Sequence, residues 1–171
     1  MVIWITGISG AGKTTVSRLL YEHYADHANS LMLLDGDQLR EVFGEKGKSG
    51  EYSRSDRLSL ALKYSKLCKL LSGQNVDVII ATISMFEEVY AWNRQNLKDY
   101  FEVYLKVPKE VVIDRDAKGL YKDYLSGRSK NVAGFDLAVD EPTRPDLVIN
   151  NFGQNGPSET VLAIIETISN A

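Results

Sequence analysis

A phosphate-binding motif near the start of the chain constrains the fold more than any other feature. Residues 7–14 have the sequence Gly-Ile-Ser-Gly-Ala-Gly-Lys-Thr, which matches the pattern G-x-x-x-x-G-K-[ST]. The apolar run at residues 2–6 predicts a buried β-strand before the motif, and residues 13–25 have the apolar spacing of a helix after it. A strand–loop–helix unit of this kind turns backbone N–H groups inward around a phosphate. The motif therefore predicts an α/β fold built around a nucleotide-binding P-loop.

The residue types in the P-loop indicate which ligands it holds. Glycines allow the tight turn, Lys13 can reach the β- and γ-phosphates, and the Thr14 hydroxyl can ligate Mg²⁺. We therefore expect ATP and Mg²⁺ at this site. The ATP-binding residues predicted in this loop are Ser9, Gly10, Ala11, Gly12, Lys13, Thr14 and Thr15. The motif is specific for nucleotide binding and says little about the group that accepts the phosphate.

Apolar runs and helical patterns alternate along the rest of the chain. Further strands are predicted at residues 31–34, 76–82, 101–107 and 147–149. Helices are predicted at residues 55–71 and 86–97, after Pro108, and from Ser158 onward. Strands separated by helices imply βαβ crossovers and a parallel sheet. We expect a five-stranded parallel sheet with helices on both faces.

Residues 1–171 are predicted to form a single domain built around the P-loop. In two stretches, about 39–55 and 117–145, the alternation of apolar runs and helical spacing weakens, and Gly, Lys, Ser and Arg become frequent. These stretches are predicted to be mobile segments over the site, one of them a lid. For the glycine- and lysine-rich residues 44–50, a solvated loop without a functional role is an equal alternative.

Composition narrows the class of protein. The 171 residues carry a net charge of −3, which argues against a general nucleic-acid binder. The single cysteine, Cys68, excludes an internal disulfide and lies in an apolar helical run, where we expect a buried thiol. No apolar stretch approaches the roughly 20 residues of a membrane helix, and no basic segment precedes residues 2–5 as in a signal peptide. We expect a cytoplasmic protein that binds neither nucleic acid nor a membrane.

Two carboxylates follow the second predicted strand as Asp35-Gly36-Asp37. Open α/β sheets place their chemistry at this end of the strands. Beside a P-loop, one carboxylate can support Mg²⁺ and the other can orient the attacking hydroxyl. We assign Asp35 mainly to the metal, with Thr14, and Asp37 mainly to the acceptor hydroxyl, although the two roles could be exchanged. The alternative is an ordinary turn with Asp37 as a helix N-cap. The predicted catalytic residues are Lys13, Asp35 and Asp37.

These residues resemble the opening of adenylylsulfate (APS) kinases, in which a P-loop is followed by a segment like Leu-Asp-Gly-Asp-Gln-Leu-Arg at residues 34–40. Further similarities follow in order over nearly the whole chain. They are Tyr-Ser-Arg-Ser-Asp-Arg at 52–57, Ile83-Ser84, Arg-Asp-Ala-Lys-Gly-Leu-Tyr at 115–121, Gly-Phe-Asp at 134–136 and Glu-Pro at 141–142. The resemblance implies a kinase of the ribose 3′-hydroxyl of a 5′-modified nucleotide, and a homodimer.

The resemblance also implies an acceptor site. Arg40 and Arg57 would bind acceptor phosphates, because a planar guanidinium can contact two oxygens. Tyr52 would stack on the base. Arg115 would lie on the lid and face the ATP phosphates. The remaining residues implied to hold the acceptor are Ile83, Ser84, Lys118, Gly119 and Leu120.

The chain departs from the APS kinase pattern on the acceptor side. An Asn and an Arg pair that usually follow Asp56-Arg57 are replaced; those places hold Leu60, Leu62 and Lys63. The Pro after Ile-Ser is Met85, and the usual arginines and aromatic that follow are replaced by Glu87, Tyr90 and Val132. Losing cationic groups from an anion site costs binding energy, so APS is expected to be a poor substrate. The changes better suit the related cytidine diphosphoramidate kinases of bacterial capsule modification, which act on a pyrimidine nucleotide.

Two alternatives remain. One is an authentic APS kinase of sulfate activation. The other is an ATP-binding switch or motor without phosphoryl transfer. The sequence contains no Asn-Lys-x-Asp element of a GTPase, and the strand predicted to end at Thr82 does so without the acidic residue of a motor ATPase. Asp35 and Asp37 with the arginine-rich lid favour a transferase.

Overall fold

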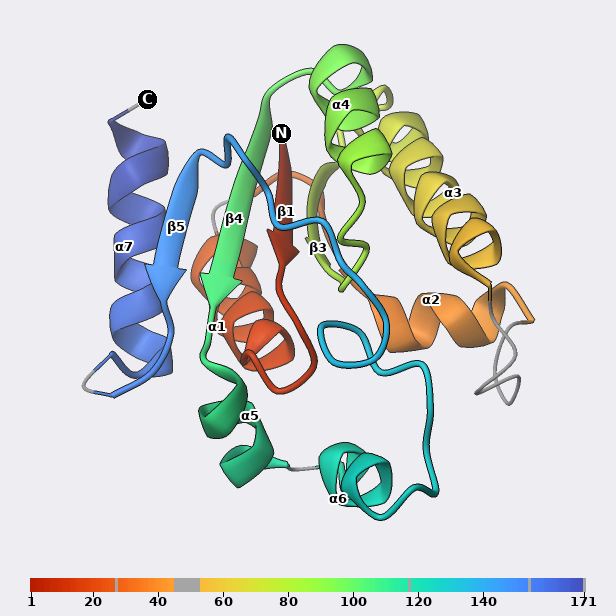
Figure 1. The fold of residues 1–171 in the computed structure, drawn as a ribbon. Coiled ribbons are helices and arrows are strands. Elements are labelled where there is room, and N and C mark those ends of the chain that lie inside the picture. Colours follow the sequence, from red (N-terminus) through yellow and green to blue (C-terminus); the bar gives the residue numbers. More distant parts are fainter. Residues whose placement is uncertain (27, 45–52, 117, 154, 171) are drawn as a thin grey trace.

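The core of the protein is a parallel five-stranded sheet with the order β2-β3-β1-β4-β5 (Figure 1). The computed structural model describes residues 1–26, 28–44, 53–116, 118–153 and 155–170. The strands are β1 (Val2–Thr6), β2 (Leu31–Asp35), β3 (Asp77–Ala81), β4 (Tyr100–Lys106) and β5 (Leu147–Asn150). Because all pairings are parallel, every strand ends at the same edge of the sheet, where the site lies.

Helices cover both faces of this sheet. Helices α1 (Lys13–Ala25) and α7 (Pro157–Ser169) pack on one face, and α3 (Arg54–Ser72) and α4 (Glu87–Asn96) pack on the other. Helices α5 (Lys109–Arg115) and α6 (Leu120–Leu125) lie beyond the carboxyl ends of the strands, and α2 (Gly36–Val42) follows β2 (Figure 1). No helix within the described ranges is long and apolar enough to cross a membrane.

Strand β1 shows why the sheet is sandwiched. All five of its residues are buried, and the four apolar ones alternate between the two cores. Ile3 and Ile5 face the helices α1 and α7, whereas Val2 and Trp4 face α3 and α4. Burying one such apolar side chain stabilises the fold by roughly 1.5–3 kcal/mol. The P-loop therefore follows a strand that is fixed from both sides.

The start of α3 is fixed by a capping box. The Ser53 hydroxyl accepts a hydrogen bond from Asp56 N, and the Asp56 carboxylate accepts one from Ser53 N, each at 3.2 Å. Reciprocal bonds of this kind satisfy two backbone donors that a helix end leaves open. They set the position of Arg57, whose guanidinium donates to Asn131 O at 2.8 Å.

The five strands and the long helices confirm the predicted fold, and Cys68 is a buried free thiol as expected. Two short helices, α2 and α6, lie where the sequence pattern thins. They have 7 and 6 residues, too few for an apolar repeat to become visible. Pro108 is the N-cap of α5 and not part of its first turn. The proposed mobility of residues 39–55 and 117–145 stays a prediction.

Candidate active site

The P-loop connects β1 to α1 and is shaped by two glycines, Gly7 and Gly12, at which any side chain would be strained. Gly7 has φ 148° and Gly12 has φ 92°, which L side chains rarely adopt. A Cβ at Gly7 would lie 2.6 Å from Leu105 O, and one at Gly12 would lie 2.5 Å from Asn151 Nδ2. The loop thus packs directly on β4 and on the residue that follows β5.

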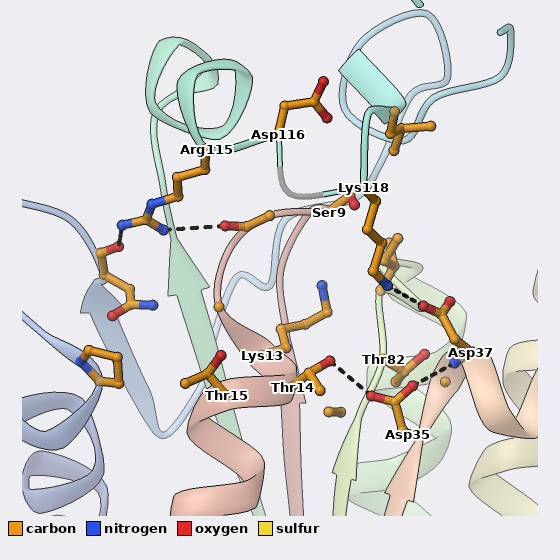
Figure 2. Close-up of a pocket in the computed structure, with 18 of the residues that line it drawn as sticks. Ser9, Lys13, Thr14, Thr15, Asp35, Asp37, Thr82, Arg115, Asp116 and Lys118 are labelled. Carbon is orange, nitrogen blue, oxygen red and sulfur yellow. Dashed lines mark hydrogen bonds and ion pairs between the residues drawn. The ribbon is translucent and has the colours of Figure 1, made fainter. Parts of the chain in front are cut away.

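Lys13 provides the positive charge at the centre of the site (Figure 2). Its ammonium donates to Ile8 O at 2.8 Å. Desolvation by the surrounding chain lowers the pKa of Lys13 to about 8, although the nearby charges of Asp37 and Asp35 oppose that shift. A desolvated ammonium is stabilised by any anion placed beside it. The position suits the phosphates of a nucleotide.

Thr14 and Asp35 form a pair that suits a divalent cation. The Thr14 hydroxyl donates to Asp35 Oδ2 at 2.9 Å (Figure 2). Mg²⁺ binds oxygens at about 2.0–2.1 Å in an octahedron, so two neighbouring ligands lie about 2.9 Å apart. A hydroxyl and a carboxylate oxygen at this spacing could therefore hold Mg²⁺ together with phosphate oxygens and water.

Asp37 stands in the first turn of α2, on the side of the site away from β4. Asp35, the N-cap of α2, accepts a hydrogen bond from Asp37 N at 2.9 Å, so Asp35 and not Asp37 is the helix cap. The Asp37 carboxylate accepts from Lys118 through Oδ2 and from Arg40 through Oδ1, the latter at 3.3 Å. Partial burial acts to raise the pKa of Asp37, but the hydrogen bond from Lys118 and the charges of Lys118, Arg40 and Lys13 outweigh it and lower the pKa. Asp37 is ionised near neutral pH.

Three side chains from later in the chain hold the P-loop backbone. Arg115, at the end of α5, donates to Gly10 O at 3.2 Å and to Asn151 O at 2.8 Å. The Tyr121 hydroxyl donates to Ser9 O at 2.7 Å, and Asn151 donates to Ala11 O, also at 2.7 Å. Sequence reasoning missed Asn151 and Tyr121. The signal for Asn151 is its place at the carboxyl end of a strand, as for Asp35.

Two cavities meet at this edge of the sheet. The first, of about 550 Å³, is lined by the P-loop, Asp35 and Arg115. The second, of about 480 Å³, lies between α3 and residues 129–139. The residues that line both are Asp37, Arg40, Thr82, Ile83 and Leu120. A chemical group transferred from a ligand in one cavity to a ligand in the other would pass beside these residues.

The second cavity is mainly apolar, with a few charged groups. Its apolar lining includes Leu60, Met85, Phe86, Val132 and Val139. Its charged lining residues are Asp37, Arg40, Arg57 and Lys130. Three of the departures from the APS kinase pattern, Leu60, Met85 and Val132, thus face this cavity. Another departure, Tyr90, is buried and donates to Asp140 O at 3.0 Å.

Most of the predicted site residues lie at the two cavities. Ser9, Gly10, Gly12, Thr15 and Lys118 line the first, and Ser84 lines the second. Ala11 and Gly119 line neither cavity as the described residues outline them: the Ala11 side chain is in the core, and Gly119 is the N-cap of α6. Tyr52 lies outside the described residues. Thr82, which lines both cavities, was not among the predicted residues.

Comparisons with known proteins agree with this geometry. The family model described as adenylylsulphate kinase matches residues 1–150. A cytidine diphosphoramidate kinase of Campylobacter jejuni is 43% identical over 168 residues, which cover 98% of this chain and 96% of that protein. A probable adenylyl-sulfate kinase of Archaeoglobus fulgidus is 33% identical over 150 residues, covering 87% and 94%. The structure of a Mycobacterium tuberculosis APS kinase in complex with AMPPNP and APS superimposes with a TM-score of 0.86 at 28% identity, covering 98% of this chain and 96% of that one.

Proposed function

Because the chain belongs to the adenylylsulphate kinase family, we propose that it phosphorylates the ribose 3′-hydroxyl of a cytidine 5′-diphosphate derivative, cytidine diphosphoramidate. It is a kinase that uses ATP with Mg²⁺ and transfers phosphate to a hydroxyl group. The observation that carries the choice of acceptor is the 43% identity with the Campylobacter jejuni enzyme over nearly the full length of both chains.

The first cavity would hold the triphosphate of ATP. The backbone N–H groups of the P-loop and Lys13 would bind the β- and γ-phosphates, and Arg115 borders the same cavity. Thr14 and Asp35 would hold Mg²⁺, which neutralises phosphate charge when bound. Thr14 and Asp35 fit a bound Mg²⁺, because the distance between their side-chain oxygens matches that between neighbouring ligands of an octahedral ion.

Asp37 would meet the acceptor hydroxyl where the two cavities join. An ionised carboxylate can accept the proton of the attacking hydroxyl and hold its oxygen in line with the γ-phosphate. The incoming hydroxyl would compete with Lys118 for Asp37 Oδ2, whereas Oδ1 is held by Arg40. Lys118, 67% exposed in its side chain, is free to turn toward the transferred phosphoryl group.

The second cavity would hold the acceptor. Arg40 and Arg57 would bind its 5′ phosphates, as they would for any 5′-modified nucleotide. The apolar lining at Leu60 and Val132 leaves fewer charged and aromatic partners than an adenylylsulfate site is expected to have. A small pyrimidine needs fewer aromatic contacts than adenine and therefore suits this lining better. The terminal phosphoramidate carries one negative charge, as a terminal sulfate does, and Arg40 and Arg57 could bind it.

An authentic APS kinase is the second candidate. The family model and the Archaeoglobus fulgidus relative support it, and Arg40 and Arg57 would serve APS equally well. A switch without phosphoryl transfer is not supported, because the matching family is one of kinases.

A nucleotide panel tests the acceptor. Purified protein is mixed with Mg-ATP and cytidine 5′-diphosphoramidate, CDP, APS or no acceptor, and ADP release and product mass are followed. We expect ADP release to need an acceptor, and the cytidine compound to exceed APS in kcat/KM by at least about tenfold. A higher kcat/KM for APS would establish the second candidate, and ADP release without acceptor would contradict the transferase. Asp37→Asn, which removes the charge and keeps the shape, is the matched inactive control.

The assembly and the compartment are further proposals. The homodimer is implied by the family resemblance, whereas the cytoplasmic location is an expectation from the sequence. Sedimentation of the purified protein and fractionation of cells would test them.

A further inference from the structure

Thr82 occupies the place where the two cavities join, and nothing in the proposed mechanism uses it. It directly follows β3 and is 5% exposed. Among the described residues that line both cavities, Thr82 is the one with a hydroxyl side chain. Figure 2 shows Thr82 beside Asp35 and Asp37, below Lys118 in this view. A hydroxyl in this place is within the region that a reacting ribose must enter.

The Thr82 hydroxyl is held in a defined position. Its Oγ1 lies 2.8 Å from Ser84 Oγ, and either atom could be the donor. A Cβ at Gly36 would lie 3.1 Å from Thr82 Oγ1, so the turn between Asp35 and Asp37 packs closely on this hydroxyl. Thr82 N donates to Ile5 O at 3.0 Å, which fixes the backbone to β1.

Its partner Ser84 is held in an uncommon backbone conformation. Ser84 has φ 28°, a value that non-glycine residues rarely adopt. The preceding carbonyl, Ile83 O, accepts from the Thr6 hydroxyl, and Phe86 N donates to Ser84 O at 3.1 Å. Backbone strain of this kind persists only where surrounding contacts hold it. Thr82 and Ser84 both line the second cavity.

We propose that Thr82, supported by Ser84, binds the 2′-hydroxyl of the acceptor and thereby selects ribose over 2′-deoxyribose. The inference rests on the proposed function. When the 3′-hydroxyl meets Asp37, the 2′-hydroxyl on the neighbouring ring carbon lies at the same junction, where Thr82 is. Because a hydroxyl both donates and accepts, the Thr82–Ser84 pair can match either role of the 2′-hydroxyl. Binding the neighbouring hydroxyl also fixes the rotation of the sugar, so the 3′-oxygen is the one aimed at the γ-phosphate.

The test crosses two enzymes with two acceptors. Wild-type protein and Thr82→Val, which replaces the hydroxyl by a methyl group, are each assayed with cytidine 5′-diphosphoramidate and its 2′-deoxy analogue. We expect wild type to favour the ribose compound by about tenfold or more in kcat/KM, as for one lost hydrogen bond in a site built to make it. Thr82→Val should lose most of this preference by becoming slower with the ribose compound only. Thr82→Ser, which keeps the hydroxyl, should retain the preference.

The outcomes separate this inference from the proposed function. Equal losses with both acceptors in Thr82→Val, or a wild-type enzyme indifferent to the 2′-hydroxyl, would overturn the role of Thr82 and leave a purely structural hydroxyl pair. If wild type used APS and no cytidine compound, the proposed acceptor would be wrong. The same cross would then be run with APS and 2′-deoxy-APS. Thr143→Val, the same substitution at an exposed position between α6 and β5, is the matched control.

Discussion

The hydroxyl of Thr14 lies 2.9 Å from Asp35 Oδ2, although the two residues belong to different βα units. The contact exists because β1 and β2 run parallel and end at the same edge of the sheet, with β3 between them. Thr14 is in the first turn of α1, and Asp35 is the N-cap of α2. The pair therefore joins the nucleotide half of the site to the half that carries Asp37.

This pairing leads to a prediction about the metal. Asp35→Asn keeps the shape of the side chain and removes its charge, so Mg²⁺ should bind more weakly while ATP still reaches the P-loop. We expect the Mg²⁺ concentration for half-maximal activity to rise by about tenfold or more, since a charged ligand contributes on the order of 1.5–3 kcal/mol. The measurement is a Mg²⁺ titration at fixed ATP. Asp37→Asn should lower kcat without moving this midpoint; a shift of the same size in both variants would contradict the division of roles.

Lys13 should be required for turnover more than for folding. Lys13→Ala removes the ammonium that is desolvated beside the P-loop, and losing a charge that stabilises the transition state at such a site costs about 10²–10³ in rate. Steady-state kinetics at saturating ATP and acceptor measures the loss, and circular dichroism checks the fold. Near wild-type kcat in a folded variant would rule out the P-loop assignment.

The local parts of the fold and site were predictable because short sequence signals determine them. The P-loop and Asp35-Gly36-Asp37 are each a continuous stretch of sequence. The strands before them are apolar runs, which can be recognised without knowing the tertiary structure. By contrast, Asn151 and Tyr121 bind the P-loop from 140 and 112 residues away. Contacts of that separation depend on how α5, α6 and β5 fold back, which periodicity does not reveal.

The position of Thr82 could be predicted from the sequence, but its place in the site could not. The strand ending at this residue was predicted, and its terminal position at the carboxyl edge was the available signal, as it was for Asp35. Its hydroxyl carries no charge and matches no motif, so only the two cavities indicate its importance. The short helices α2 and α6 were missed for a different reason, because one or two turns give no repeat.

A buried carboxylate far from the P-loop should make stability depend on pH. Glu102 is 1% exposed and accepts hydrogen bonds from Tyr100 at 3.1 Å and Arg94 at 3.4 Å. Burial raises the pKa of Glu102 from 4.5 to about 7, although Arg94 opposes the shift. The folded protein therefore holds a proton that the unfolded chain has lost, and the stability from this group falls as pH rises from about 4.5 to 7.

Glu102→Gln removes this titration. Relative to wild type, the variant should gain on the order of 3 kcal/mol in unfolding free energy between pH 4.5 and pH 8, which is the linkage value for a shift of this size. Urea unfolding at several pH values measures the difference. Glu166→Gln, at an exposed position of α7, is the control and should show no such trend. A constant difference between wild type and Glu102→Gln would mean that folding does not raise the pKa of Glu102.

Arg57 tests the acceptor half of the site separately from the nucleotide half. It lines the second cavity and not the first, and it also donates to Asn131 O at 2.8 Å, on the segment that covers this cavity. Arg57→Ala should raise the KM for the acceptor by about tenfold to a hundredfold, because one charged hydrogen bond to phosphate is lost. The KM for ATP should stay within about twofold. Arg57→Lys keeps the charge and loses the planar fork of the guanidinium. Its KM for the acceptor should therefore lie between those of wild type and Arg57→Ala. Arg18→Ala, at an exposed position of α1, controls for net charge. Equal increases in both KM values would indicate that Arg57 acts by holding the fold around Asn131.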